Sequence, residues 1–426
     1  MSHLDPAIAA AIRSAAASLS GETEALLARL VRHRSLLGNE QSCLDEMEAA
    51  YAGIGLHPRR VAIDAAALAS HPGFSPPLIP YDGREPVAAV HRPSVGGGRS
   101  LMLQGHLDVV PEGAADLWTT PPFEPSIRDG RMYGRGAADM KAGVAATVLA
   151  FKALQLAGLQ PAGMVQFASV IEEECTGNGA LAVMQALDKP DACLIPEPFP
   201  SLLVAEVGVV WAWVTVTGRP AHVLAMQSGV NAIEAAFAIV RHFKEYEAEM
   251  NRPERCHPSF AAETHPINVN FGTIEGGEWN SSVPTRARIG LRVGVMPGYS
   301  CRDVAHDIEQ LVARAAQSPE LGGATVKLEF KGFMADGCTF PADQAISRLI
   351  SGRHAAETGA TLPHYAAKGL TDARHYVLYQ GTEATCYGPD GSNIHSIDES
   401  VDLASLHQVT SVLALTIAEW CGVEKL

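Results

Sequence analysis

Five separated segments of the sequence carry side chains that bind divalent metal ions in proteins. His106 and Asp108 stand two residues apart, so in an extended chain they point to the same side. One of them can then bind a metal while the other orients the imidazole. The other segments are the glycine-rich stretch that ends at Asp139, the acidic run 172–174, the Pro-Glu-Pro around Glu197 and the late segment that contains His395.

Each of these residues has a structural alternative when it is taken alone. Asp139 stands at the start of a predicted helix and could be only its N-cap. Glu197 or His395, taken singly, is more often structural. Three adjacent acids at 172–174 are ordinary in a solvated loop, but here they follow the buried run MVQFASVI. We therefore expect this run to face a cation or to contain a carboxyl group with a raised pKa.

Together the segments supply His, Asp, Glu, Glu and His, with no thiolate. Mixed nitrogen and oxygen ligands suit zinc, cobalt or manganese. The set is large enough for two metal ions that share a bridging carboxylate. Two ions about 3.5–4 Å apart can hold a hydroxide and polarise a carbonyl group. A remaining glutamate would take the water proton and return it to a leaving nitrogen, so the predicted chemistry is hydrolysis of an amide.

Strand-like and helix-like segments alternate around these residues. Apolar runs at 100–106, 164–174 and 192–198 each end in polar side chains, and a helix-like stretch at 140–158 lies between the first two runs. This alternation predicts an α/β fold with a mostly parallel central sheet. Because ligands bind beyond the carboxyl ends of such strands, we expect the polar side chains to meet at one edge.

A different pattern starts near Gly208. The order over 208–330 is strand, helix, strand, strand, helix, strand, which predicts a small, ferredoxin-like α+β sandwich with one sheet face left open. The α/β character returns after about residue 331. We therefore predict a catalytic domain in two parts, 1–207 and 331–426, interrupted by an inserted domain at 208–330.

Several motifs, in order between about Leu101 and Val401, resemble the M20 metallopeptidase family. They are LMLQGHLDVVPEG, W-x4-F-x-P-x3-DGRMYGRGAADMKAGVAA, EEECTGNGA, PEP and GPDGSNIHSIDES. The family includes acetylornithine deacetylase, succinyl-diaminopimelate desuccinylase, aminoacylase and glutamate carboxypeptidase. The resemblance implies a zinc-exopeptidase-like catalytic domain and a lid domain that also forms dimers.

The resemblance also implies a role for each matching residue. One metal ion would be bound by His106, Asp139 and Glu197, and the second by Asp139, Glu174 and His395, with Asp139 bridging. Glu173 would be the general base and acid for attack by a metal-bound hydroxide. The Gly179-Ala180 pair, which matches the Gly-Ala after the family's Glu pair, sets this register within the triple acid.

Further implied roles concern orientation. Asp108 would orient His106, and the family suggests a cis peptide bond between Asp139 and Met140. His222, in the Gly-x-x-Ala-His pattern of the lid, would reach the substrate carbonyl oxygen, commonly across the dimer.

The substrate-binding positions follow the family pattern less closely. The family's Asn before the lid's Val-Pro is replaced by Ser281, and the neighbouring Asn280 is the candidate that remains. The family's Arg appears as Arg292, shifted by two residues, which keeps the same strand face. Arg374 would pair with a substrate carboxylate or, equally, form a structural ion pair. The apolar stretch 62–82 has no assigned role beyond a position near the cleft entrance.

Composition excludes several classes of function. The 426 residues carry a formal net charge of −15, so we expect no nucleic-acid or anionic-membrane partner. Eight scattered cysteines without a CxxC pair favour reduced thiols in a cytoplasmic protein. We see neither a secretion signal in the first residues nor an apolar run of membrane-spanning length.

The sequence thus predicts a homodimeric two-metal amidohydrolase, with zinc as the first choice of metal and cobalt or manganese as alternatives. We expect an acetylornithine-deacetylase-like deacylase that acts on N-acyl amino acids. The nearest rival is an exopeptidase or dipeptidase on small peptides, or a desuccinylase. A non-catalytic binding protein would be expected to have lost a ligand or the base, and here every position is filled.

Overall fold

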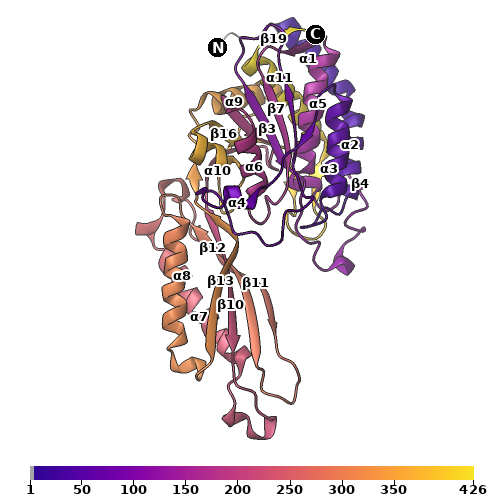
Figure 1. Cartoon of the computed structure of the whole chain (residues 1–426). Helices are drawn as coiled ribbons and strands as arrows, with labels where there is room; N and C mark the ends of the chain where they lie inside the picture. Colours follow the sequence, from indigo (N-terminus) through magenta and orange to yellow (C-terminus); the bar gives the residue numbers. More distant parts are fainter. Residues whose placement is uncertain (1–3) are drawn as a thin grey trace.

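The computed structural model describes residues 4–426, which form two parts. The larger part is built on a six-stranded sheet (Figure 1). The strand order is β1-β2-β7-β3-β8-β16. The pairs β7–β3, β3–β8 and β8–β16 are parallel, and only the pairs that involve β2 are antiparallel. The predicted α/β fold with a mostly parallel central sheet is confirmed. The strands are β1 (Arg59–Arg60), β2 (Val87–His91), β3 (Leu101–His106), β7 (Val165–Val170), β8 (Ala192–Ile195) and β16 (Glu383–Cys386).

Helices bury this sheet. α5 packs on β3 and on α11, and α1 and α2 contact α5 in turn. α5 is apolar around nearly its whole circumference, which is typical of a helix enclosed between other elements. β3 and β7 are buried along their full length for the same reason. The helices are α1 (Pro6–Ser18), α2 (Ser20–Arg32), α3 (Gln41–Gly53), α4 (Ala65–Leu68), α5 (Ala142–Leu156), α6 (Asn178–Ala186), α9 (Ala345–Thr358), α10 (Ala373–His375) and α11 (Leu403–Cys421).

Smaller sheets complete this part. A four-stranded sheet has the order β17-β18-β5-β4, a three-stranded sheet the order β14-β9-β15, and β19 pairs with β6. Their strands are β4 (Ser126–Arg128), β5 (Arg131–Tyr133), β6 (Leu159–Pro161), β9 (Leu202–Glu206), β14 (Cys338–Thr339), β15 (His364–Ala367), β17 (Gly391–Ser392), β18 (Ser400–Asp402) and β19 (Val423–Lys425).

The register of the parallel strands brings polar residues to one edge of the central sheet. His106 is the last residue of β3 and pairs with Val170, the last residue of β7. The acids that follow Val170 therefore leave the sheet beside His106. β8 ends at Ile195, two residues before Glu197. Three strands thus deliver side chains to the same edge, as expected for parallel strands.

The second part, which we call the inserted unit, is a four-stranded antiparallel sheet with two helices (Figure 1). The chain order is β10, α7, β11, β12, α8, β13, and the strand order β11-β12-β10-β13 is the ferredoxin-like arrangement. Both helices pack on the sheet and share one apolar core with it. The elements are β10 (Gly208–Thr217), α7 (Ala232–Met250), β11 (Val269–Gly276), β12 (Arg286–Val295), α8 (Cys301–Ala316) and β13 (Thr325–Ala335).

Period-two alternation along β10 explains why one face of this sheet stays open. Val210, Ala212 and Val214 are fully buried, whereas Trp211 and Trp213 are only partly buried. The boundary that the sequence predicts at 330 falls inside β13, because that strand continues to Ala335 as it returns to the larger part.

The segment 62–82, which had no assigned role, connects the two parts. Asn178 at the start of α6 exchanges hydrogen bonds with the backbone of Ser75, with the Ser75 amide donating 3.0 Å to its oxygen. The Ser75 hydroxyl accepts from the Met334 amide at 3.1 Å, and the Pro76 carbonyl accepts from the Gly332 amide at 2.8 Å. The segment therefore holds β13 against the turn that follows β7.

All eight cysteines lie within the described residues and are free thiols. Within residues 4–426, no helix combines the length and the apolar character that crossing a bilayer requires.

Candidate metal centre

His106, Asp139 and Glu197 form one potential ligand set, in which the ligand atoms all lie within 4.8 Å of one another. His106 Nε2 is 3.0 Å from Asp139 Oδ1 and 4.0 Å from Glu197 Oε1. His106 comes from the end of β3, Glu197 follows β8, and Asp139 lies on the glycine-rich turn that leads into α5. The Asp139–Met140 peptide bond is cis.

A second set consists of Asp139, Glu174 and His395. His395 Nε2 is 2.9 Å from Glu174 Oε1 and 3.4 Å from Asp139 Oδ2. The two oxygens of Asp139 thus face the two histidines separately. This is the geometry that a bridging carboxylate needs. The His395 side chain is half exposed, so the cluster opens to solvent on this side.

Glu173 lies beside both sets. Its Oε2 atom is 3.8 Å from His106 Nε2, and it forms a third possible ligand group with His106 and Glu174. Burial raises the pKa of Glu173 well above its ordinary value, and the negative charges of Glu197 and Glu174 raise it further. A carboxyl group with a raised pKa is suited to exchange protons near neutral pH.

The electrostatics of the cluster fit bound cations. Burial and the charge of Asp139 raise the pKa of Glu197. The charge of Glu174 raises the pKa of His395 to about 11, and contacts with Asp139 and Glu173 raise that of His106 although burial alone would lower it. So many like charges in one buried cluster need positive charge, from protons or from metal ions. Imidazole and carboxylate donors are those that zinc accepts.

The backbone carbonyl of Asp108, rather than its carboxylate, lies closer to the His106 imidazole. His106 Nδ1 is 2.9 Å from the Asp108 carbonyl oxygen and 3.8 Å from its carboxylate. The Asp108 carboxylate is already engaged, because it accepts hydrogen bonds from the amides of Glu173 and Glu174 at 3.3 and 3.1 Å. Asp108 therefore fixes both the imidazole and the acidic turn.

The first acid of the run, Glu172, faces away from the metal ligands. Its φ of 63° turns the chain, and its carboxylate pairs with Arg84 at 2.6 Å. Tyr81 and Thr176 donate hydrogen bonds to the same carboxylate at 2.8 and 2.7 Å. Glu173 and Glu174 are thus the two acids of this run that join the cluster.

Sequence reasoning missed Glu399, which positions Asp139. The buried Glu399 carboxylate accepts from the backbone amides of Ala138 and Asp139 at 2.9 and 3.0 Å. Its other oxygen pairs with Arg135 at 2.5 Å. Both residues lie inside motifs that the sequence already singled out, but nothing in their spacing shows that segments 264 residues apart meet.

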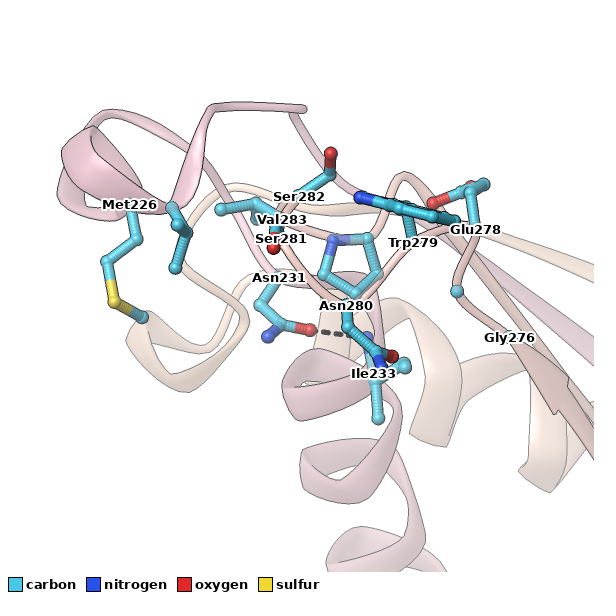
Figure 2. Close-up of a pocket in the computed structure, with 13 residues that line it drawn as sticks. Met226, Asn231, Ile233, Gly276, Glu278, Trp279, Asn280, Ser281, Ser282 and Val283 are labelled. Atoms are coloured by element: carbon cyan, nitrogen blue, oxygen red, sulfur yellow. Dashed lines mark hydrogen bonds between the residues drawn. The ribbon is translucent and has the colours of Figure 1, made fainter.

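His222 and Asn280 lie together at the far tip of the inserted unit, away from the metal ligands. His222 forms a β-bridge with Ser282, and Asn280 lies on the same loop. Figure 2 shows Asn280 near Asn231 and Ile233 in a pocket of about 680 Å³, with Met226 on the opposite side of that pocket. This tip is the end of β10 and β12 that points away from the larger part (Figure 1). A single chain does not bring these two residues to the metal ligands.

Arg292 lies nearer to the larger part. Its guanidinium donates a hydrogen bond to the Lys368 carbonyl at 2.9 Å, and it pairs across the sheet with Trp211. Arg292 therefore lies on the open face of the inserted sheet, beside Trp211.

Arg374 has the contacts of a structural residue. Its side chain is 1% exposed, it donates to the Thr371 carbonyl at 2.8 Å, and it lies 3.6 Å from the Asp372 carboxylate. So little exposure leaves no surface for a substrate carboxylate. The structure therefore favours the ion-pair alternative for Arg374.

Two imidazoles and four carboxylates, clustered at the carboxyl edge of a parallel sheet, define a metal-dependent hydrolase. Residues 102–419 match the family described as peptidase family M20/M25/M40. The N-formyl-4-amino-5-aminomethyl-2-methylpyrimidine deformylase of Halalkalibacterium halodurans is 26% identical over 347 residues, which cover 77% of this chain and 80% of that protein. A succinyl-diaminopimelate desuccinylase of Rhodospirillum centenum is 28% identical over 410 residues, covering 93% and 96%.

Among solved structures, the dipeptidase Dug1p of Saccharomyces cerevisiae has the same fold. It superposes with a TM-score of 0.80 over 97% of this chain and 98% of that chain, at 13% identity. The present chain belongs to peptidase family M20/M25/M40, as its motifs predicted, and is a hydrolase of amide bonds.

Proposed function

We propose that this enzyme removes the acyl group from N-acyl amino acids. The observation that carries the proposal is the position of Glu173, a buried carboxyl group with a raised pKa that lies beside two ligand sets sharing Asp139. An amide needs a proton at its leaving nitrogen before the C–N bond breaks. A buried carboxyl group that can accept a proton and return it meets this need.

The proposed cofactors are two divalent metal ions, with zinc first and cobalt or manganese as alternatives. His106, Asp139 and Glu197 would hold one ion, and Asp139, Glu174 and His395 the other. When bound, the ions would activate water and polarise the scissile carbonyl. Glu173 would accept the water proton at its carboxylate and pass it to the leaving nitrogen.

Residues outside the cluster would position the substrate. The Arg292 guanidinium would bind the substrate carboxylate, and its place on the open sheet face supports this role. His222 and Asn280 would serve the metal centre of a second copy in a homodimer. Their distance from the ligands of their own chain supports this arrangement. The cytoplasmic location stays a prediction.

The nearest alternative is an exopeptidase or dipeptidase acting on small peptides. The two curated relatives are named as a deformylase and a desuccinylase, which supports acyl removal over peptide cleavage. An acetylornithine-like substrate is one member of the proposed class.

A substrate panel tests the proposal. N-acetyl, N-succinyl and N-formyl amino acids and dipeptides would be incubated with the zinc- or cobalt-loaded enzyme, and release of primary amine would be measured. We expect turnover of at least one N-acyl amino acid and slower turnover of the dipeptides. Turnover of dipeptides alone would replace the proposed activity with that of a peptidase.

A further inference from the structure

The open face of the inserted sheet carries two tryptophans in adjacent cross-strand rows. Trp211 pairs with Arg292, and Trp213 pairs with Gly290 two residues along β12. On β11, Asn270 and Thr273 pair with the same two residues of β12. These six residues, together with Gly272 and Leu291, border a cavity of about 160 Å³, which we call the indole slot.

Glycines allow both indoles to lie against the sheet. A Cβ atom at Gly290 would be 2.6 Å from Cζ3 of Trp213, and one at Gly332 would be 2.4 Å from Cε3 of Trp211. Any larger residue at either position would push the ring away from the strand. The slot is therefore shaped by two rings and by the two glycines beneath them.

The size and the lining of the slot select an apolar group. A cavity of 150 Å³ with apolar walls binds benzene, so about 160 Å³ accommodates one phenyl ring or a branched aliphatic chain. The indole N–H groups of Trp211 and Trp213 are shielded and have no acceptor among the described residues. The accessible parts of the two rings are therefore carbon, which favours an apolar occupant.

The charges around the slot favour an anionic ligand. Arg292 borders it, and the Arg288 guanidinium lies 4.4 Å from the centre of the Trp213 ring. Arg292 uses one donor on the Lys368 carbonyl, and a guanidinium has five. Arg288 pairs across the sheet with Glu275 and lies near Glu329, the partner of Trp213 on β13, so carboxylates already oppose its charge. Arg292 is therefore the cation that the slot offers to a carboxylate attached to an apolar group.

The slot adjoins the part of the molecule that carries the metal ligands. The Trp211 ring packs edge-on against Phe333 at 5.5 Å, and Phe333 lies 5.7 Å from the Arg374 guanidinium. Arg374 contacts Asp372, whose carboxylate accepts from Gln104 on β3, the strand that ends at His106. The slot lies in the middle of the inserted sheet, and its Trp211 and Arg292 side is the one that contacts residues near the larger part.

We propose that the indole slot binds the aromatic or branched side chain of the amino acid that the enzyme releases, with Arg292 facing its carboxylate. This inference rests on the proposed deacylase function and narrows its substrate class. The preferred substrates are N-acyl derivatives of aromatic or bulky apolar amino acids rather than of small or basic ones.

The test measures binding without turnover. Zinc-loaded Glu173→Gln enzyme would be titrated with N-acetylphenylalanine and with N-acetylglycine in a calorimeter. Burying a phenyl ring predicts a preference of about tenfold to a hundredfold for N-acetylphenylalanine. In the same background, Trp213→Leu removes one wall. Gly272→Leu fills the slot, since a Cβ there would meet only Asn270 Nδ2, at 3.6 Å.

We expect both variants to lose the preference while their affinity for N-acetylglycine is kept. The matched control is Ile274→Ala, because Ile274 lies on β11, is 54% exposed and pairs with Ile289 on the helix-covered face. This control should keep the preference. An equal affinity for both ligands, or a preference that persists in both slot variants, would overturn the proposal.

Two further outcomes separate the alternatives. If the wild-type enzyme hydrolyses no N-acyl amino acid but the Glu173→Gln enzyme still shows the preference, the slot assignment stands and the deacylase function fails. If Trp213→Leu lowers the mass measured by light scattering while the preference is unchanged, the slot contacts a second copy and the proposal is wrong.

Discussion

Three consecutive acids after β7 occupy three different environments. Glu172 pairs with Arg84, Glu173 lies beside His106, and Glu174 lies beside His395. The positive φ of Glu172 turns the backbone so that its side chain leaves the cluster that its neighbours enter. Without that turn, three negative charges would share one site, which costs more than two. The role of an acid here depends on backbone direction as well as on position in the run.

The pair Glu173 and Glu174 should separate catalysis from metal binding. We expect Glu173→Gln to lower kcat by about 10²- to 10⁴-fold, the usual contribution of a general acid–base group, while metal content is kept. Glu174→Gln should reduce the metal content, because it removes a charged ligand oxygen. Metal analysis beside steady-state kinetics checks both. Loss of metal in Glu173→Gln would move the base role to another residue.

At the scale of elements, the sequence predicted which polar residues follow the strands. It did not predict the contacts between segments that are distant in sequence. Parallel strands that end in polar residues must place those residues at one edge, so His106, Glu174 and Glu197 followed from the pattern. Glu399 contacts the Asp139 turn from a segment far away in sequence, and no local pattern reveals such a pairing. The role of Arg374 was also not predictable, because only its burial in the folded chain distinguishes an ion pair from a substrate contact.

The contacts of the segment 62–82 and of Arg84, two residues after it, were equally unpredictable, because they are made with elements far away in the sequence. Arg84 pairs with Glu40 at the start of α3 and with Glu172 on the acidic turn, and both partners are buried. Ser75 and Pro76 hold β13 at the same time. The same segment therefore contacts both the acidic turn and β13. These contacts link the position of Glu173 to that of β13.

Removing Arg84 should therefore be costly. Arg84→Met leaves two buried carboxylates without a cation and should lower the free energy of unfolding by about 3–5 kcal/mol. The matched control is Arg92→Met, because the Arg92–Asp188 pair is exposed at both side chains and should contribute less than about 1 kcal/mol. Urea unfolding of the two variants checks this. Equal effects would mean that the buried network contributes no more than a surface pair.

At the scale of the whole molecule, the chain separates the proposed catalytic groups. The metal ligands lie in the larger part, and His222 lies beyond the far end of β10. A ten-residue strand is roughly 30 Å long, so the His222 imidazole is far from the Asp139 of its own chain. If both act on one substrate, they must come from different copies, which makes the homodimer part of the proposed site.

Subunit mixing tests this arrangement. Homodimers of His222→Ala and of Glu173→Gln should each be nearly inactive. Mixing equal amounts under conditions that allow exchange should give heterodimers with one intact site, formed by Glu173 of one copy and His222 of the other. Because half of the dimers are then mixed and each has one working site of two, activity should return to about a quarter of the wild-type value. A mixture as inactive as its parents would mean that His222 serves its own chain or has no catalytic role.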